Sequence, residues 1–172
     1  MNALSGALGL IREVPDFPEP GVLFRDINPV LADPAAFRVL TDALASGVAP
    51  GTEVLVAVEA RGFLLGAAMA YAMGLGLVCV RKPGKLPAVE HRVDYALEYG
   101  TATLELPATV VRAGQRVAIV DDVLATGGTV TATKQLVEHC GARVTGVHVV
   151  FEIAALAARD RLGVPVHALL TD

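Results

Sequence analysis

Residues 117–133 read VAIVDDVLATGGTVTAT, a stretch in which two adjacent carboxylates precede a loop with few side chains. Gly127 and Gly128 let the backbone turn so that its N–H groups converge, just before a helix that we expect to begin near Thr129. The N-terminus of a helix attracts anions because its first amides lack partners and its dipole is positive. The hydroxyl of Thr126 would add a donor, so the pattern predicts a phosphate site. The alternative is a capped turn without a ligand.

The two carboxylates, Asp121 and Asp122, directly follow the apolar run of this stretch. Beside a phosphate they would repel it, so we expect them to face ribose hydroxyls, a Mg²⁺ ion or a sugar carbon that develops positive charge. The loop is therefore typical of a sugar-phosphate site. It lacks the Gly-Lys-Ser/Thr of a nucleoside-triphosphate loop, and its glycine spacing does not fit a dinucleotide-binding motif.

The surrounding sequence alternates between apolar strands and helices. We expect helices at 3–12, 62–73, 129–140 and 153–162, a further helix that Asp33 caps, and strands at 53–58, 76–80, 115–121, 143–151 and 166–170. This alternation indicates an α/β fold, with an open, mostly parallel sheet flanked by helices on both faces. Ligands bind beyond the carboxyl ends of the strands in such sheets, which brings residues 59–62 (EARG) and 121–129 to one edge.

Two segments interrupt the alternation. Residues 14–34 carry five prolines and two turn signals, and we expect an ordered irregular segment there. Residues 81–100 are long, charged and rich in turn formers, and connections of this kind inside compact domains are commonly functional. We expect a flanking hairpin that carries a mobile loop.

Composition and charge exclude several functional classes. The length of 172 residues suits one domain, 1–172. The net charge of −4 and the absence of any basic run longer than Arg81-Lys82 argue against nucleic-acid binding. Residues 62–80 are uncharged over nearly the length of a membrane span. Because Gly74 and Gly76 interrupt them, we expect a helix and a buried strand and no membrane segment.

The two cysteines, Cys79 and Cys140, lie far apart in the sequence. We expect them to be reduced packing residues, which predicts a cytoplasmic protein. The N-terminus lacks the positive region of a signal peptide. The four histidines show no metal-ligand spacing, so we assign no residue as a metal ligand.

The segment VAIVDDVLATGGT resembles the signature of type I phosphoribosyltransferases, which bind phosphoribosyl pyrophosphate (PRPP). Together with it, four further stretches are similar to the adenine phosphoribosyltransferase family: PDFPEPGVLFRDINPVL (15–31), EARGFLLG (59–66), VRKPGKLP (80–87) and YALEYGTATLEL (95–106). The resemblance implies the type I fold, a base-binding hood with a first helix over residues 1–33, a flexible loop over 81–100 and a homodimer. It also implies that PRPP and adenine give AMP and pyrophosphate in purine salvage.

The resemblance assigns the sugar and its 5′-phosphate to the first motif. Asp121 and Asp122 would face the ribose hydroxyls and support the positive charge that develops at C1. The alternative is that this pair caps the strand end. The 5′-phosphate would be held by Ala125, Thr126, Gly127, Gly128 and Thr129.

The resemblance assigns the pyrophosphate to cations of two other motifs. Arg61 would pair with its oxygens, in a turn where we expect a cis peptide between Ala60 and Arg61. The alternative is a surface arginine paired with Glu59. The further cations would be Arg81, Lys82 and Lys85, some of them reaching across a dimer interface. The alternative for these three is a solvated charged loop. Mg²⁺ is expected, held mainly by PRPP, pyrophosphate and water.

Acid–base chemistry and base recognition complete the implied roles. Glu98 would accept the proton that leaves the purine ring, and Tyr99 would help close the loop over the site. The alternative is an exposed hairpin glutamate. Adenine would be recognised by backbone groups of Leu23 and Arg25 and by the side chains of Phe24 and Ile153. The alternative for these residues is core packing.

Two competing functions remain at this point. The same fold could use guanine, hypoxanthine or xanthine in place of adenine. A PRPP-sensing transcription regulator would need an added DNA-binding element and a basic face. No helix-turn-helix is recognisable before residue 50, and the charge of −4 is unfavourable for a regulator of this kind.

Overall fold

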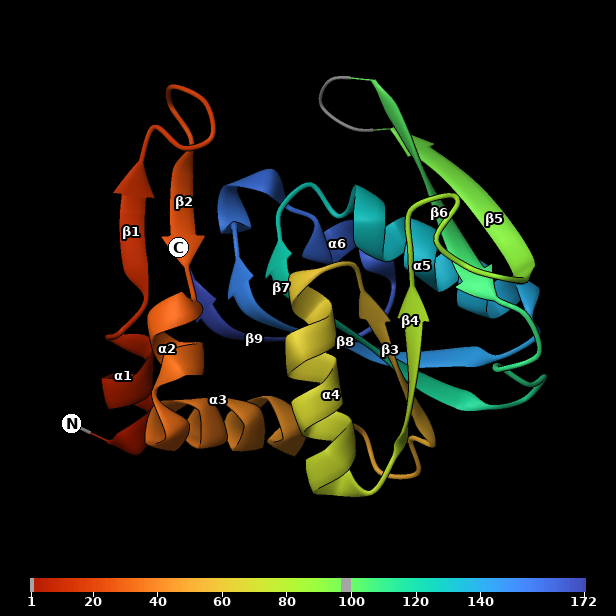
Figure 1. The fold of residues 1–172 in the computed structure, drawn as a ribbon, viewed down its shortest axis with the longest axis horizontal. Coiled ribbons are helices and arrows are strands. Elements are labelled where there is room, and N and C mark those ends of the chain that lie inside the picture. Colours follow the sequence, from red (N-terminus) through yellow and green to blue (C-terminus); the bar gives the residue numbers. More distant parts are fainter. Residues whose placement is uncertain (1, 97–99) are drawn as a thin grey trace. The chain divides into compact units, whose positions relative to one another are not determined.

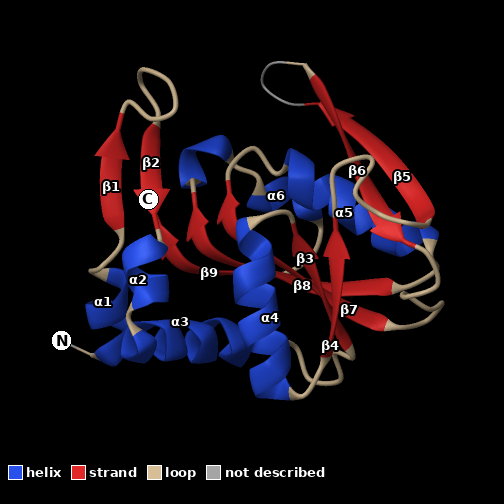
Figure 2. Cartoon of the chain, viewed as in Figure 1, coloured by secondary structure: helices blue, strands red, loops and turns tan. Residues whose placement is uncertain are grey.

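The structure is a computed structural model that describes residues 2–96 and 100–172. Its contacts group the chain into a smaller unit that ends at Ala43 and a larger one that begins at Leu44. The larger unit contains the elements that carry the phosphate motif (Figures 1 and 2). Its strands and helices are β3 (Val54–Val58), α4 (Arg61–Met73), β4 (Gly76–Val80), β5 (Val89–Ala96), β6 (Thr101–Pro107), β7 (Arg116–Leu124), α5 (Gly128–His139), β8 (Arg143–Glu152), a 3-10 turn η1 (Ala154–Leu156), α6 (Arg159–Leu162) and β9 (Val166–Thr171).

Five strands of the larger unit form one sheet in the order β4-β3-β7-β8-β9, and every neighbouring pair is parallel. All five residues of β3 are buried, as expected for a central strand that is covered on both faces. The predicted α/β class is confirmed. The chain leaves β3 toward β4 on one side and later returns to β7 on the other side. The carboxyl ends of β3 and β7 therefore flank the switch point where parallel sheets bind ligands.

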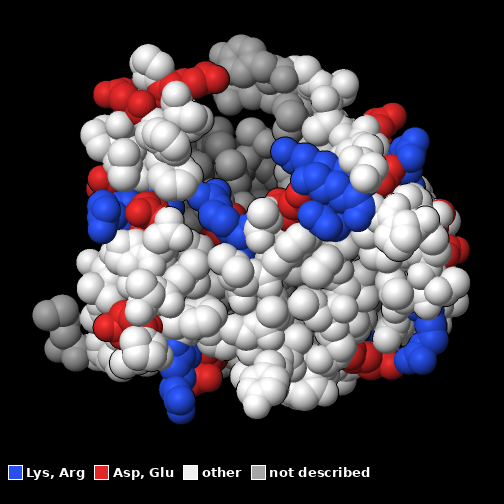
Figure 3. Space-filling model, viewed as in Figure 1, with Lys and Arg blue, Asp and Glu red and all other residues white. Residues whose placement is uncertain are grey.

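Helix α4 and strand β4 account for the uncharged run 62–80. Gly74 ends the helix with a left-handed φ of 66°, which explains why the run divides into a helix and a strand. Among the described residues, no helix has the length and apolar character that crossing a membrane requires. The outer side of α4 is nevertheless apolar: Leu64 is 51% exposed and Tyr71 is 92% exposed. In Figure 3 the surface over the middle of α4 carries no charged side chains.

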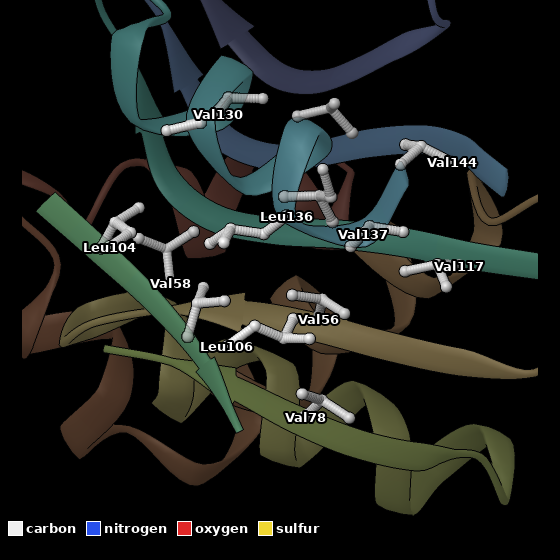
Figure 4. Close-up of a cluster of buried hydrophobic side chains, with 14 of the residues drawn as sticks. Val56, Val58, Val78, Leu104, Leu106, Val117, Val130, Leu136, Val137 and Val144 are labelled. Carbon is white, nitrogen blue, oxygen red and sulfur yellow. The ribbon is translucent and has the colours of Figure 1, made fainter. Parts of the chain in front are cut away.

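The main core lies on the other side of the sheet, under α5 and the β5–β6 hairpin. Ala57 faces α4, because a Cβ added to Gly66 of that helix would lie 2.7 Å from the Cβ of Ala57. Val56 and Val58 alternate with Ala57 and therefore face α5, where they join a buried cluster (Figure 4). Further members of this cluster are Val78, Leu104, Leu106, Val117, Val130, Leu136, Val137 and Val144.

The smaller unit contains a short hairpin in a region where we expected irregular chain. Strands β1 (Arg12–Pro15) and β2 (Leu23–Asp26) pair in antiparallel register, so the prediction for 14–34 is wrong in part. The edge-to-face contact of Phe17 and Phe24, with ring centroids 5.1 Å apart, stabilises this hairpin in spite of its prolines. Its helices are α1 (Ala3–Leu8), α2 (Asn28–Ala32) and α3 (Pro34–Ser46), which continues past the unit boundary.

Asp33 begins α3 as predicted, because its carboxylate accepts hydrogen bonds from the amides of Ala35 (2.9 Å) and Ala36 (2.8 Å). Two predicted helices are shorter than expected. The helix predicted for 3–12 ends at Leu8, before Gly9. The segment predicted as a helix over 153–162 consists of η1 and α6, separated by Ala157 in a left-handed conformation with φ 48°. The hairpin predicted to flank residues 81–100 is confirmed as β5 and β6.

Candidate functional site

The predicted phosphate loop connects the end of β7 to the start of α5. Gly127 is the N-cap of α5 and has a left-handed φ of 82°. Its carbonyl accepts a hydrogen bond from the Thr131 amide at 2.8 Å, which starts the helix. A Cβ at Gly127 would also lie 3.0 Å from the Cβ of Ala158. Both the conformation and the close packing require glycine here, and the predicted turn before a helix is confirmed.

The hydroxyl of Thr129 lies in the first turn of α5. Thr129 Oγ1 is 3.4 Å from the hydroxyl oxygen of Tyr95 on β5, and the Thr129 carbonyl accepts a hydrogen bond from Thr133 Oγ1 at 2.8 Å. Thr126 is exposed, whereas Ala125, Gly128 and Thr129 are half-buried. The loop thus has hydroxyls and helix-end amides together at the carboxyl edge of the sheet. Tyr95 is a neighbour of the loop that was not among the predicted site residues.

The acidic pair lies inside β7, which continues beyond the predicted strand end to Leu124. Asp121 is 9% exposed and Asp122 is 5% exposed. The Asp122 amide donates to Asp121 Oδ1 at 2.8 Å. Burial raises the pKa of Asp121 well above its usual value, and the charge of Asp122 raises it further, while Arg61 acts in the opposite direction. Two buried carboxyl groups side by side favour a cationic or hydroxyl-rich ligand.

Arg61, at the start of α4 in the turn after β3, forms an ion pair with this acidic pair. Its Nε lies 2.7 Å from Asp122 Oδ2. The close approach of α4 to β7 depends on Gly62, because a Cβ there would lie 2.9 Å from the Val120 carbonyl oxygen and 3.2 Å from Asp121 Oδ1. Gly62 was not among the predicted site residues, although a glycine directly after Arg61 is a signal of close backbone approach.

The predicted cis peptide is one residue out of place. The cis bond joins Glu59 to Ala60, so the predicted Ala60–Arg61 bond is wrong. Ala60 is already the N-cap of α4, and its carbonyl accepts a hydrogen bond from the Phe63 amide at 3.2 Å. The Ala60–Arg61 peptide therefore belongs to the first turn of the helix.

The predicted cationic cluster gathers around Glu59. The Glu59 carboxylate accepts a hydrogen bond from the Lys82 amide (2.9 Å), forms an ion pair with the Lys85 ammonium, and lies 3.6 Å from Arg81 Nε. Burial raises the pKa of Glu59, but the bonds from Lys85 and Lys82 and the Arg81 charge outweigh it and lower the pKa below its usual value. Figure 3 shows basic side chains gathered over the segment after β4, with acidic atoms among them.

A second carboxylate residue, Glu105 on β6, forms hydrogen bonds with the same segment, residues 81–85. Glu105 is 1% exposed. Its carboxylate accepts hydrogen bonds from Arg92 (2.6 Å) and from the Gly84 amide (3.2 Å), and its backbone exchanges two hydrogen bonds with Arg81. Glu105 was not among the predicted site residues, because an acidic residue in the alternating run TATLEL indicates only a solvent-facing strand position.

The residues predicted to bind the base lie in both units. Leu23, Phe24 and Arg25 belong to β2, and Arg25 forms an ion pair with Glu13 at 3.2 Å. Ile153 follows β8 in the larger unit, and its amide donates to the Leu124 carbonyl at 3.0 Å. Base binding by these residues stays a prediction. The predicted acid/base Glu98 and the loop residue Tyr99 lie outside the described residues.

Within residues 2–96 and 100–172, no three or more His, Cys, Asp or Glu side chains are grouped so that they could hold a metal ion. Asp121 and Asp122 are the buried carboxylates directly before the phosphate loop, and Asp122 is already paired with Arg61. This donor set suits a divalent cation that takes most of its ligands from substrate oxygens and water, as Mg²⁺ commonly does.

Comparison with known proteins agrees with this geometry. Residues 31–165 match the phosphoribosyl transferase domain family. The chain is 60% identical to adenine phosphoribosyltransferase from Saccharopolyspora erythraea, over 98% of this chain and 92% of that protein. Its structure is similar to that of adenine phosphoribosyltransferase from Thermoanaerobacter pseudethanolicus, with TM-score 0.94 and 46% identity over 98% of this chain and 99% of that one. It is also similar to the enzyme from Saccharomyces cerevisiae complexed with D-2,5-dideoxy-2,5-imino-altritol 1,6-bisphosphate and adenine, with TM-score 0.91 and 36% identity over 98% of each chain.

Proposed function

Because the chain belongs to the phosphoribosyl transferase family, we propose that it transfers the 5-phosphoribosyl group of PRPP to adenine. The products are AMP and pyrophosphate, and the reaction is a step of purine salvage. The observation that carries the phosphoribosyl part is the glycine-capped turn from β7 into α5, with a buried acidic pair directly before it. The choice of adenine is supported by relatives of that activity, which match nearly the whole chain.

In this proposal the 5′-phosphate binds at residues 125–129, where the N-terminal amides of α5 and the hydroxyls of Thr126 and Thr129 meet it. Purine N9 attacks C1 of the ribose while the bond from C1 to the pyrophosphate oxygen breaks. Asp121 and Asp122 face the ribose and stabilise the positive charge at C1 by being fixed beforehand in a buried position. The raised pKa of Asp121 is consistent with a carboxyl group that lacks a sufficient cationic or hydroxyl-rich partner until the substrate binds.

The leaving pyrophosphate is bound by Arg61 and by the cations of residues 81–85. Arg61 is fixed by Asp122, and Lys85 and Arg81 are paired with Glu59, so positive groups are already gathered on one side of the switch point. Mg²⁺ would neutralise part of the pyrophosphate charge. Asp121 and Asp122 are the carboxylates that would face its bound water and substrate oxygens.

Proton transfer and base recognition complete the proposal. Glu98 accepts the proton that the purine ring loses, and Tyr99 helps to exclude water that would hydrolyse the activated sugar. Backbone groups of Leu23 and Arg25 match the hydrogen-bonding edge of adenine, Phe24 lies against the base, and Ile153 provides an apolar wall.

The test is an assay of purified protein with Mg²⁺, PRPP and each purine base in turn. We expect AMP from adenine and at least about a hundredfold less nucleotide from hypoxanthine, guanine or xanthine, because a site that pairs with the amino group leaves polar atoms unpaired against a wrong base. Nucleotide from guanine or hypoxanthine but not from adenine would move the chain to another branch of the family. Saturable DNA binding that PRPP modulates, without turnover, would support a regulator.

We further propose a cytoplasmic homodimer. Cys79 and Cys140 are both free, which suits a reducing compartment. The dimer is supported by the apolar outer side of α4, where Leu64 and Tyr71 are exposed and no charged side chain interrupts residues 62–80. Contiguous apolar surface of this kind is typical of a protein–protein interface.

A further inference from the structure

Arg161 on α6 contacts the phosphate loop, although it lies outside the motifs quoted from the sequence. Its Nη2 donates hydrogen bonds to the Thr126 carbonyl at 2.9 Å and to the Leu156 carbonyl at 3.0 Å. The side chain is exposed. An exposed arginine that binds two carbonyl oxygens joins two segments, here the loop after β7 and the η1–α6 segment.

The orientation of the bound carbonyl matters for anion binding. In a trans peptide the C=O of one residue and the N–H of the next point in opposite directions. When Arg161 holds the Thr126 carbonyl on its own side, the Gly127 N–H points to the opposite side. A carbonyl oxygen that faced a phosphate would repel it, whereas an N–H in the same place would bind it. Gly127 tolerates either orientation of this peptide, since it has no Cβ.

The segment that carries Arg161 is itself fastened to the sheet. Arg159 forms a two-point ion pair with the buried Glu152 at the end of β8 and donates to the Val166 carbonyl at 2.8 Å. The hydrogen bonds from Arg159 lower the pKa of Glu152, and those to Glu152 raise the pKa of Arg159, so both stay ionised at neutral pH. Bidentate pairs of this kind fix geometry as well as charge.

Two further contacts place this segment against the loop. The Ile153 amide donates to the Leu124 carbonyl at 3.0 Å, at the end of β7. Ala158 packs closely on Gly127, because a Cβ added to Gly127 would lie 3.0 Å from the Cβ of Ala158. We propose that Arg161 is a positioning residue for the phosphate loop: anchored through this segment, it orients the Thr126–Gly127 peptide so that its N–H faces the phosphate. The inference rests on the proposed function only in that residues 125–129 bind phosphate.

The test compares ribose 5-phosphate, AMP and pyrophosphate as ligands, measured by calorimetry with Mg²⁺ present. The variants are Arg161→Ala, Arg161→Lys and, as a matched control, Arg143→Ala, which removes an exposed arginine from the opposite end of the sheet. We expect Arg161→Ala to bind ribose 5-phosphate and AMP about tenfold more weakly, the effect of one lost charge-assisted hydrogen bond. Pyrophosphate, which has no 5′-phosphate, should bind as in the wild type. Arg161→Lys should recover part of the loss, and Arg143→Ala should match the wild type.

The outcomes separate this inference from the proposed function. Equal affinity of wild type and Arg161→Ala for ribose 5-phosphate would overturn the inference and leave the function standing. Equal weakening of pyrophosphate binding would also overturn it, because that indicates a general structural defect. If Arg161→Ala weakens the binding of ribose 5-phosphate but the wild type does not turn over adenine, the inference stands and the assignment of adenine as substrate is wrong. If ribose 5-phosphate does not bind the wild type, the loop is not a phosphate site and both fail.

Discussion

At the scale of single residues, Asp121 shows the conflict between stability and function most clearly. Burial beside Asp122 raises its pKa above the value of 3.8 for an unfolded chain. The folded protein therefore binds this proton more tightly than the unfolded chain does. This contribution to stability is complete below pH about 4 and is lost as the pH rises through the raised pKa.

Asp121→Asn removes the titrating group and keeps the shape of the side chain. We expect the ligand-free variant to gain thermal stability relative to the wild type as the pH rises from about 4 to 8. Its turnover of PRPP and adenine should fall about tenfold or more, because a fixed negative charge beside C1 is lost. Thermal unfolding across this pH range measures the first effect.

The control for Asp121→Asn is Asp42→Asn, which changes an exposed carboxylate on α3. Its unfolding curve should follow that of the wild type at every pH. A stability difference between Asp121→Asn and the wild type that shrinks toward high pH would contradict the assigned direction of the pKa.

Single residues were predictable where the chemistry is contiguous in the sequence. Asp121, Asp122 and residues 125–129 form one motif, so local chain geometry places them together. Contacts across the sheet were not predictable in this way. The pairing of Arg61 with Asp122 and of Arg161 with Thr126 depends on how α4 and α6 pack, and no local pattern records that packing.

At the scale of elements, Glu105 connects three parts of the larger unit. It lies on β6, binds Arg92 on β5, and holds Gly84 and Arg81 of the segment after β4. We expect Glu105→Gln to lower the free energy of unfolding by about 1–3 kcal/mol, the cost of weakening a buried charge-assisted network. Affinity for pyrophosphate should fall as well, because residues 81–85 lose part of their support. Urea unfolding and pyrophosphate titration measure the two effects.

Glu90→Gln is the matched control, since Glu90 is exposed on β5 and accepts a hydrogen bond from the Thr109 amide at 3.0 Å. It should change stability by less than about 0.5 kcal/mol. If Glu105→Gln were as stable as this control and bound pyrophosphate normally, Glu105 would have no role in supporting the segment.

The bounds of three apolar strands were predicted well, although β4, at the edge of the sheet, is only partly buried and is not the fully buried strand that we expected. Strands β3, β4 and β8 fall within one residue of the predicted bounds, because an apolar run between turn formers fits little else. The segment 153–162 is predicted as one helix, and its alanines favour that form. Tertiary contacts override this preference: Ile153 is tied to Leu124, Arg159 is tied to Glu152, and Ala157 takes a left-handed conformation between them.

At the scale of the whole molecule, the apolar side of α4 predicts self-association. Tyr71 is 92% exposed, and burying it against a second copy would remove a large apolar surface from water. We expect light scattering after size-exclusion chromatography to give twice the mass of one chain. Tyr71→Glu should give a monomer, because it introduces a charge into the contact. Tyr71→Phe, which keeps the ring, should remain a dimer. A monomeric wild type would refute the dimer, and a dimeric Tyr71→Glu would place the interface elsewhere.

We expect the turn at Gly127 to be essential for phosphoribosyl transfer to adenine by this chain. The most direct measurement is the amount of AMP and pyrophosphate formed from PRPP and adenine by wild type, Gly127→Ala and Gly114→Ala. Gly114 also has a positive φ of 78°, but a Cβ there would meet open space, so it controls for backbone strain alone. We predict equal amounts of AMP and pyrophosphate from the wild type and from Gly114→Ala, and a loss of about a hundredfold in kcat/KM for Gly127→Ala, which perturbs preorganised donors. No AMP from the wild type, or undiminished AMP from Gly127→Ala, would contradict the account.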